Sequence, residues 1–125
     1  MRLAQARLDQ IVAQARADAP LETCGLFTGQ DDQVEQVVPV QNVLHSAVAF
    51  RMDDQALANV IHAQGEPLAI YHSHPNGPAE PSETDIAQAY YPDSVYIIIS
   101  LAQEPPSVRA FRIVSGVVSE LALEI

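Results

Sequence analysis

The chain has 125 residues and a mass of about 13.5 kDa, the size of one compact domain, so we expect a single domain over residues 1–125. Apolar residues make up 48% of the chain, which is enough to bury a core and excludes a compositionally disordered protein. Six arginines, no lysine and sixteen acidic residues give a formal charge of −10, which argues against a nucleic-acid binder because neutralising phosphates needs a basic face.

The cysteine content and the N-terminal segment indicate the cellular location of the protein. A single cysteine, Cys24, excludes an intrachain disulfide and a zinc site built only from cysteines. Residues 1–19 carry charged side chains throughout and have no unbroken apolar stretch, so they resemble neither a secretory signal nor a membrane span. We therefore expect a soluble, cytoplasmic protein that does not associate with membranes.

The first half of the chain predicts a helix, a hairpin and a second helix. Apolar residues at helical spacing over 2–18, followed by Pro20, predict an amphipathic helix. Two apolar runs, 24–28 and 34–40, flank a short polar turn and predict a β-hairpin, and a further short strand is predicted over 48–52. Asp53 is a suitable N-cap for a second helix, and Gly65 is a suitable residue to end it.

The second half predicts a short buried strand, a proline-rich loop, a short helix and a closing β-hairpin. In chain order these cover residues 68–71, 75–81 and 82–90, then a β-prone run over 95–101 and hairpin strands over 108–114 and 116–123. Helices interleaved with strands in this order predict an α+β or α/β sandwich. Its sheet should be mixed, mostly antiparallel and flanked by helices.

The chemistry is concentrated where the strand 68–71 meets the proline-rich loop. His72 and His74 are two residues apart, and side chains at i and i+2 of a strand point to the same face, so both imidazoles can converge on one metal ion. A catalytic zinc usually takes three protein ligands and leaves the fourth position to water. Asp85, one turn into the following helix, is the nearest good candidate for the third ligand. Ser82 and Asp85 also match a helix capping box, and one pair of residues can serve both purposes.

The combination of these residues is more specific than its parts. His72, Ser73 and His74 are followed by seven residues, then Ser82, two residues and Asp85. This pattern resembles, at full spacing, the signature of the JAMM family of zinc metalloproteases, which is also called MPN-plus.

The resemblance extends upstream and covers most of the chain. Residues 20–26, which read Pro-Leu-Glu-Thr-Cys-Gly-Leu, are similar to the family's glutamate segment, in which a proline, an acid and a glycine open the first strand. The large insertion that gives the eukaryotic deubiquitinating members their linkage selectivity is absent. The chain therefore resembles the small, single-domain prokaryotic branch.

The resemblance implies a cytidine-deaminase-like JAMM fold and one zinc ion per chain, held by two imidazoles and one carboxylate. The ligands would be His72, His74 and Asp85. It also implies that Glu22 is the general acid/base and that Ser82 steadies the tetrahedral intermediate, roles that suit a carboxylate and a hydroxyl beside a metal-activated water.

The residues alone leave the choice of base open. Glu66, Glu80 and Glu83 lie nearer to the histidines in sequence than Glu22 and, without the resemblance, are equally eligible.

The implied activity is that of a peptidase or isopeptidase. The implied partners are ubiquitin-like or sulfur-carrier proteins, and the bond cleaved lies at their glycine-rich C-terminal tail, either to a lysine amine or to a short C-terminal extension. A chain without lysine cannot itself be modified at a lysine, which is consistent with this activity.

Four other classes of protein match the sequence less well than a JAMM peptidase does. A non-catalytic MPN-type scaffold is disfavoured because all five motif positions are filled, and a RadC-type relative working on DNA is disfavoured by the charge. A metallo-β-lactamase would need an Asp and a His soon after His74, and a zinc deaminase would need a Pro-Cys-x-x-Cys motif, so both fail.

Several chemistry-bearing residues are interpreted as ordinary. We expect His45, His62 and Cys24 to be surface or packed residues outside the site. Tyr90 and Tyr91 are interpreted as a surface and a core aromatic rather than a recognition pair.

Overall fold

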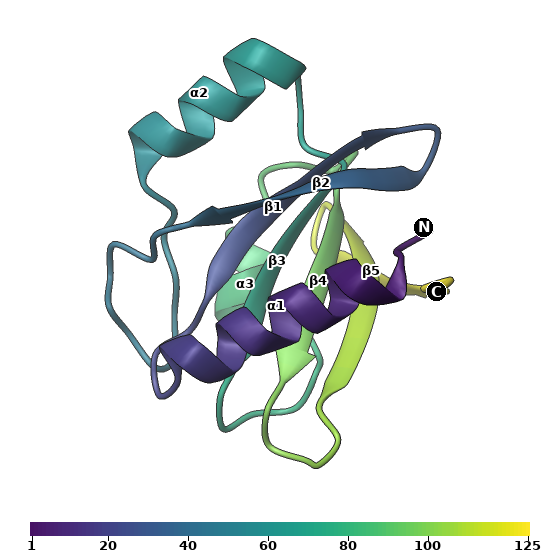
Figure 1. The fold of residues 1–125 in the computed structure, drawn as a ribbon. Helices are drawn as coiled ribbons and strands as arrows, with labels where there is room; N and C mark the ends of the chain where they lie inside the picture. The colour runs from purple at the N-terminus through teal and green to yellow at the C-terminus, as the bar shows by residue number, and fades with distance from the viewer.

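One six-stranded sheet carries helices on both faces in the computed structural model, which describes residues 1–125 (Figure 1). The elements in chain order are α1 (Gln5–Asp18), β1 (Cys24–Gln30), β2 (Gln33–Val40), α2 (Asp54–Gln64), β3 (Ala69–His74), α3 (Glu83–Ala87), β4 (Val95–Ser100), β5 (Ser107–Val114) and β6 (Val117–Leu121). The strand order is β2-β1-β3-β4-β5-β6, and the β3–β4 pair alone is parallel. The predicted mixed, mostly antiparallel sheet flanked by helices is confirmed.

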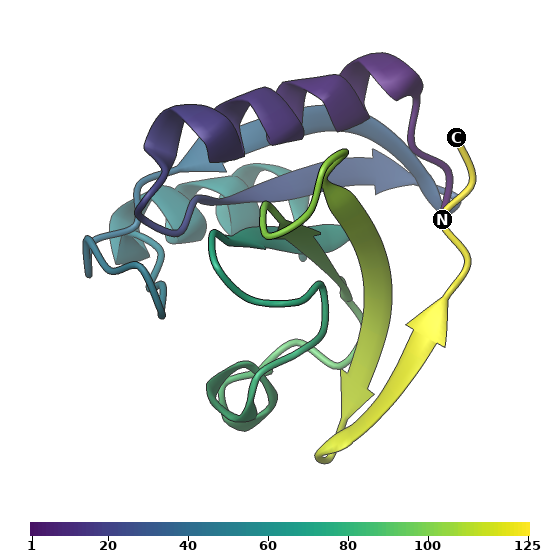
Figure 2. The same ribbon diagram turned by 90° about the horizontal axis from the view of Figure 1, so that it is seen from below.

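The first helix begins later than predicted. Arg2 forms isolated bridges with Gln33 and Glu124, and the backbone N–H of Leu3 donates to the carbonyl of Glu124 at 2.8 Å. These contacts hold the first residues in an extended conformation, so the helix starts at Gln5 and not at residue 2. The two ends of the chain consequently lie side by side (Figures 1 and 2).

The second helix has the predicted ends, but the strand predicted before it is wrong. The Asp53 carboxylate accepts from the N–H of Ala56 at 3.0 Å, and Gly65 follows the helix with a φ of 81°. Residues 48–52 form no strand beyond one bridge between Asn42 and Met52. The Asn42 side chain takes two backbone groups of this segment that a strand partner would otherwise use, the N–H of Arg51 and the carbonyl of Ala49, so residues 41–52 form a loop, here called the 41–52 loop.

In the second half, β3 is longer and α3 is shorter than predicted. β3 runs to His74, so both histidines belong to the strand itself. α3 ends at Ala87 because the N–H of Tyr91 donates to the Tyr96 hydroxyl at 3.0 Å and does not continue the helix. None of the three helices has the length and apolar composition needed to cross a membrane.

The sheet separates two apolar layers. Alternate residues of β1, β3 and β4, including Phe27, Tyr71 and Ile97, pack beneath α1. The residues between them, including Leu26 and Ile70, pack toward α2 and α3. Figure 2 shows α1 on one side of the sheet, with α2 and α3 on the other. Because side chains alternate along a strand, the histidines of β3 lie on the same face as Ile70, toward α3.

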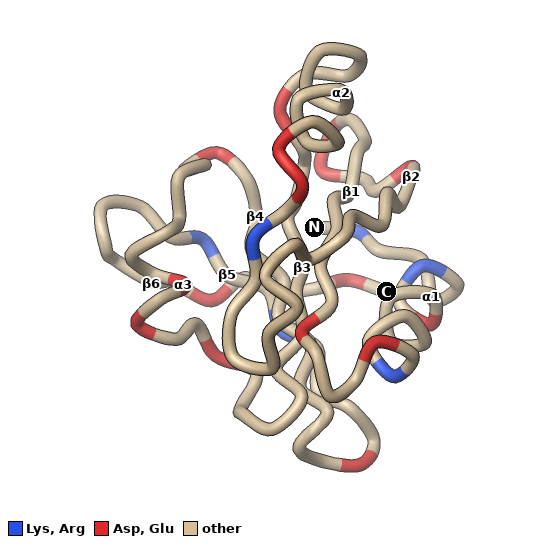
Figure 3. The backbone as a smooth tube through the Cα atoms, turned by 90° about the vertical axis from the view of Figure 1, so that its left-hand side faces the viewer, with Lys and Arg blue, Asp and Glu red and all other residues tan.

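The charged residues are spread over several elements (Figure 3). Four of the six arginines form ion pairs: Arg2 with Glu124, Arg16 with Glu104, Arg51 with Asp54, and Arg109 with Glu80 and Glu120. Exposed pairs of this kind contribute little to stability, since water screens them. The fold is therefore held mainly by the two apolar layers.

Gly25 gives a direct test of the packing beneath α1. It lies opposite Tyr71 in the β1–β3 register, and a Cβ at this position would overlap the buried phenol ring. We expect Gly25→Ala to lower the free energy of unfolding by about 3 kcal/mol in urea denaturation, because the ring has no room to move. Gly77→Ala is the matched control, since its Cβ would meet its nearest neighbour at 3.7 Å, an ordinary contact. Equal stability of the two variants would contradict this account of the core.

Candidate metal centre and catalytic site

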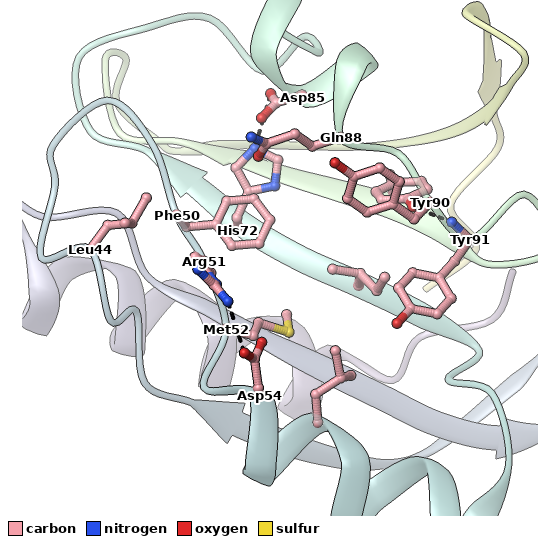
Figure 4. Close-up of a pocket in the computed structure, with 13 residues that line it drawn as sticks. Leu44, Phe50, Arg51, Met52, Asp54, His72, Asp85, Gln88, Tyr90 and Tyr91 are labelled. Atoms are coloured by element: carbon pink, nitrogen blue, oxygen red, sulfur yellow. Dashed lines mark hydrogen bonds and ion pairs between the residues drawn. The ribbon is translucent and has the colours of Figure 1, made fainter.

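Three side-chain atoms from two separate elements converge at the carboxyl end of β3. The Nε2 atoms of His72 and His74 are 3.1 Å apart, and the Oδ2 atom of Asp85 lies 3.1 Å from each of them. The structure thus brings together the three residues that the sequence predicts as ligands. Figure 4 shows Asp85 reaching down from α3 onto His72.

The chemistry of this donor triangle fits a bound cation. His74 Nδ1 is 2.7 Å from the carbonyl oxygen of Pro78, which can only accept, so Nδ1 carries a proton. In a neutral His74, Nε2 then points a lone pair at the Asp85 carboxylate and at the second imidazole. Such an arrangement is repulsive without a proton or a metal ion between the atoms. Two imidazoles and one carboxylate are a donor set that zinc and other divalent first-row metals accept.

The protonation states of two donors favour metal binding as well. At the third, His74, burial alone would lower the pKa, but hydrogen bonds with Asp85 and Pro78 raise it, so a metal ion would have to displace a proton there. Complete burial lowers the pKa of His72, so its imidazole is neutral, the form that ligates metals. Burial alone would raise the pKa of Asp85, but hydrogen bonds with His72, His74 and the N–H of Ser82 lower it well below its usual range. Asp85 is therefore ionised at any pH at which the fold is expected to work.

Asp85 is held by the start of α3. Its Oδ2 accepts from the N–H of Ser82 at 2.9 Å, and its own N–H donates to Ser82 Oγ at 3.1 Å. This reciprocal pair is the predicted capping box. One carboxylate therefore both caps the helix and lies in the donor triangle, while its role as a metal ligand stays a prediction. On the opposite side, the Phe50 ring stacks on the His72 imidazole with centroids 4.5 Å apart.

Glu22 lies beside these donors because of the β1–β3 register. Cys24 pairs with His72, and the next residue back, Thr23, accepts from the N–H of Ser73 at 3.1 Å. Continuing the register by one more residue puts Glu22 opposite His74. The Glu22 side chain is 4% exposed, and its Oε1 has no hydrogen-bond partner.

Burial also sets the acidity of Glu22. It raises the pKa of Glu22 to about 7, against the opposing attraction of His74. A carboxyl group that titrates near neutrality next to a set of metal donors has the properties of a general base. By contrast, Glu66, Glu80 and Glu83, which the sequence left eligible, are all exposed.

Ser82 is exposed, and its Oγ accepts from the N–H of Asp85. The structure therefore gives it a capping contact beside the donors, while its role in catalysis stays a prediction.

A cavity of about 640 Å³ opens beside the donor triangle (Figure 4). Its lining includes His72 and Asp85 at one end, and most of the other side chains are apolar or aromatic. They come from the 41–52 loop, α2, β3, β4 and the segment after α3: Leu44, Phe50, Arg51, Met52, Asp54, Leu57, Ile70, Gln88, Tyr90, Tyr91 and Tyr96. The cavity is large enough to hold several side chains of an extended peptide.

Tyr90 and Tyr91 thus line the cavity, a role that sequence reasoning missed. Two adjacent tyrosines after a predicted helix were the available signal. Their position in the cavity wall depends on tertiary packing with residues of the 41–52 loop, which the local sequence does not reveal (Figure 4).

The residues interpreted as ordinary lie outside the donor triangle. His45 and His62 are exposed, on the 41–52 loop and on α2. Cys24 is completely buried, and its Sγ is 3.3 Å from the carbonyl oxygen of Val40. Burial raises the pKa of this thiol to about 12, as for an inert core cysteine.

Comparisons with known proteins identify the family. Residues 4–114 match the family described as prokaryotic homologs of the JAB domain. The CysO-cysteine peptidase of Mycobacterium tuberculosis is 36% identical over 121 residues, covering 90% of this chain and 82% of the relative. A probable TtuB-protein conjugate cleaving protease of Thermus thermophilus is 38% identical, covering 93% and 76%. A desampylase of Haloferax volcanii is 34% identical, covering 74% of each chain.

Solved structures agree with the fold. A protein of Desulfitobacterium hafniense superposes with a TM-score of 0.85 and 33% identity, covering 98% of this chain and 90% of the other. A JAB1/MPN domain protein of Archaeoglobus fulgidus superposes over the whole of both chains with a TM-score of 0.67, and its 21% identity supports the fold alone. The chain therefore belongs to the family of prokaryotic homologues of the JAB domain, and it is an enzyme of the JAMM metalloprotease type.

Proposed function

We propose that this enzyme is a zinc-dependent peptidase or isopeptidase that hydrolyses an amide bond at the C-terminal tail of a ubiquitin-like or sulfur-carrier protein. The observation that carries the proposal is the buried, unpartnered carboxylate of Glu22 beside the convergent atoms of His72, His74 and Asp85. The substrate class is supported by the names of three relatives: a CysO-cysteine peptidase, a probable TtuB-protein conjugate cleaving protease and a desampylase.

In this proposal the two imidazoles and the Asp85 carboxylate hold one zinc ion per chain. When bound, the ion supplies Lewis acidity, which lowers the pKa of water and polarises a carbonyl group. Glu22 accepts the proton of the attacking water and then donates it to the leaving amine. The same carboxyl group can perform both transfers, since burial raises its pKa to about 7 in the metal-free chain.

Ser82 is proposed to steady the negative charge that develops on the carbonyl oxygen. Its Oγ accepts from the N–H of Asp85 at 3.1 Å, which leaves the hydroxyl proton available for donation. A donor that is already oriented by a helix cap needs little reorganisation during the reaction.

The cavity next to His72 and Asp85 is the proposed path for the substrate tail. Its apolar walls and open mouth suit an extended peptide that approaches the donors from the side of Tyr90 and Phe50 (Figure 4). An extended tail exposes its scissile carbonyl without unfolding the globular body of the substrate protein.

The test is cleavage of defined substrates by the purified chain loaded with zinc. We expect mass spectrometry to show scission after the terminal Gly-Gly of a ubiquitin-like or sulfur-carrier protein that carries a cysteine extension or a lysine conjugate. Chelation with 1,10-phenanthroline should abolish cleavage, and added zinc should restore it. The control substrate has the same globular body with the Gly-Gly replaced by Pro-Pro. Binding of the tailed proteins without scission would instead favour a non-catalytic scaffold.

A further inference from the structure

We propose that Asn42 is a positioning residue that holds the proposed base, Glu22, in place by tying the 41–52 loop to its backbone. This inference rests on the proposed role of Glu22. Asn42 makes no contact with the donor triangle itself, so it would act only through the groups that it holds.

The side-chain amide of Asn42 is buried and fully used. Its Nδ2 donates to the carbonyl oxygens of Glu22 and Ala49, each at 3.1 Å. Its Oδ1 accepts from the N–H groups of Leu44 and Arg51, also at 3.1 Å. An asparagine side chain offers two donors and two acceptor sites, so every one of them is satisfied. No other side chain of similar size could replace this set of bonds.

The register of the sheet sets where Glu22 lies, but the hydrogen bonds of its own backbone go to this loop. Glu22 precedes β1, whose pairing with β3 begins at Cys24. Its N–H donates to the carbonyl of Ser46 at 2.8 Å, and its own carbonyl accepts from Asn42. Both polar groups of the Glu22 backbone are therefore held by the 41–52 loop. Removal of the Asn42 amide leaves the Glu22 carbonyl without its donor. It also loosens the turn that carries Ser46, the acceptor of the Glu22 N–H.

The three side chains of the donor triangle are held by other elements than the Glu22 backbone. His72 and His74 are fixed by β3, and Asp85 is fixed by the cap of α3. Neither element is bonded to the Asn42 side chain, and the 41–52 loop contacts the donors through the Phe50 ring stacked on His72. Loss of Asn42 should consequently disturb the base more than the metal site. The same loop lines the cavity, so KM should rise as well. General-base catalysis depends on placement of the carboxylate to within a fraction of an ångström, however, so turnover should fall by the larger factor.

The first experiment compares Asn42→Ala with Ser94→Ala. Ser94 is also completely buried and donates to the Pro67 carbonyl at 2.7 Å, but it lies at the opposite end of β3 and β4. We expect Asn42→Ala to lower kcat at least tenfold with KM changed less than threefold and zinc content unchanged. Ser94→Ala should leave kcat within twofold. Equal losses of kcat in the two variants would overturn the proposal, since both would then reflect general destabilisation.

Asn42→Asp provides a second variant if Asn42→Ala folds poorly. It has the same shape and keeps two acceptors, but it loses both donations, so kcat should again fall at least tenfold. Unchanged kcat in a folded Asn42→Asp protein would contradict the positioning role.

A double variant tests whether Asn42 acts through Glu22. In the Glu22→Gln background the base is already missing, so adding Asn42→Ala should lower the residual rate less than twofold. If the double variant instead loses the product of the two single-variant factors in rate, Asn42 acts independently of Glu22, and the proposal is overturned.

Amide hydrogen exchange separates this inference from the proposed function. The N–H of Glu22 should exchange at least tenfold faster in Asn42→Ala than in Ser94→Ala, and this readout does not require a substrate. A wild-type protein that cleaves nothing would refute the proposed function, while the exchange rates would still decide whether Asn42 holds Glu22. Equal exchange at Glu22 in both variants would overturn the inference.

Discussion

Replacement of Glu22 by glutamine is expected to lower kcat by about 10³-fold while the zinc content per chain stays at the wild-type level. The amide has the shape of the carboxylate but cannot accept the proton of the attacking water. The donors of β3 and α3 are untouched by this change. Single-turnover cleavage of the tailed substrate and elemental analysis of the same sample measure the two quantities together.

Glu66→Gln is the matched control, because Glu66 is exposed and lies closer in sequence to the histidines. We expect it to retain full activity. Turnover above about a tenth of the wild-type value in Glu22→Gln would show that another group is the base.

Glu22→Gln should lower turnover, but it should raise the stability of the metal-free protein. The pKa of Glu22 is raised by burial to about 7, so the folded chain holds a proton that the unfolded chain releases at lower pH. The contribution of Glu22 to wild-type stability should therefore fall as pH rises from about 4.5 through 7. Metal-free Glu22→Gln should be more stable than wild type by about 3 kcal/mol at pH 8, and equal to it below pH 4. Urea denaturation at the two pH values checks this sign and shows that lost turnover is not lost folding.

Asp85→Ala is expected to abolish stoichiometric zinc binding. It removes one of the three converging atoms and leaves two imidazoles, and it also deletes half of the capping box of α3. We expect zinc per chain, measured after gel filtration, to fall from near one to less than a tenth. Zinc should also cease to raise the melting temperature, because a ligand stabilises only a fold that binds it.

Glu83→Ala, in the same turn of α3, tests whether any acidic residue there would have sufficed. Glu83 is exposed, and its loss should leave zinc binding intact. Full zinc content in Asp85→Ala would refute the assignment of Asp85 as a ligand.

The convergence of the donors could be predicted because it depends on short-range geometry. Two histidines at i and i+2 share a face on any strand, and a capping box fixes the direction of Asp85 within one turn of helix. The proline-rich loop between them limits how far the two elements can separate. Such features are local, so the residues themselves specify them.

The choice of base and the walls of the cavity depend on burial, which the local sequence does not reveal. Glu22 differs from Glu66, Glu80 and Glu83 by its burial, and that follows from the β1–β3 register. The incorrect strand over 48–52 has a similar origin. Its apolar residues suit a strand, but the Asn42 side chain takes the hydrogen bonds of Ala49 and Arg51 that a strand partner would need.

The burial of Cys24 has a practical consequence for assays in crude extracts. Its thiol is enclosed by the sheet, and with a pKa near 12 almost none of it is thiolate at neutral pH. Alkylating reagents such as iodoacetamide silence cysteine-dependent peptidases but find no reactive sulfur in this chain. Deconjugating activity that survives alkylation and disappears with a chelator is therefore not that of a cysteine-dependent peptidase, and the proposed activity of this chain can be distinguished from that class in an extract.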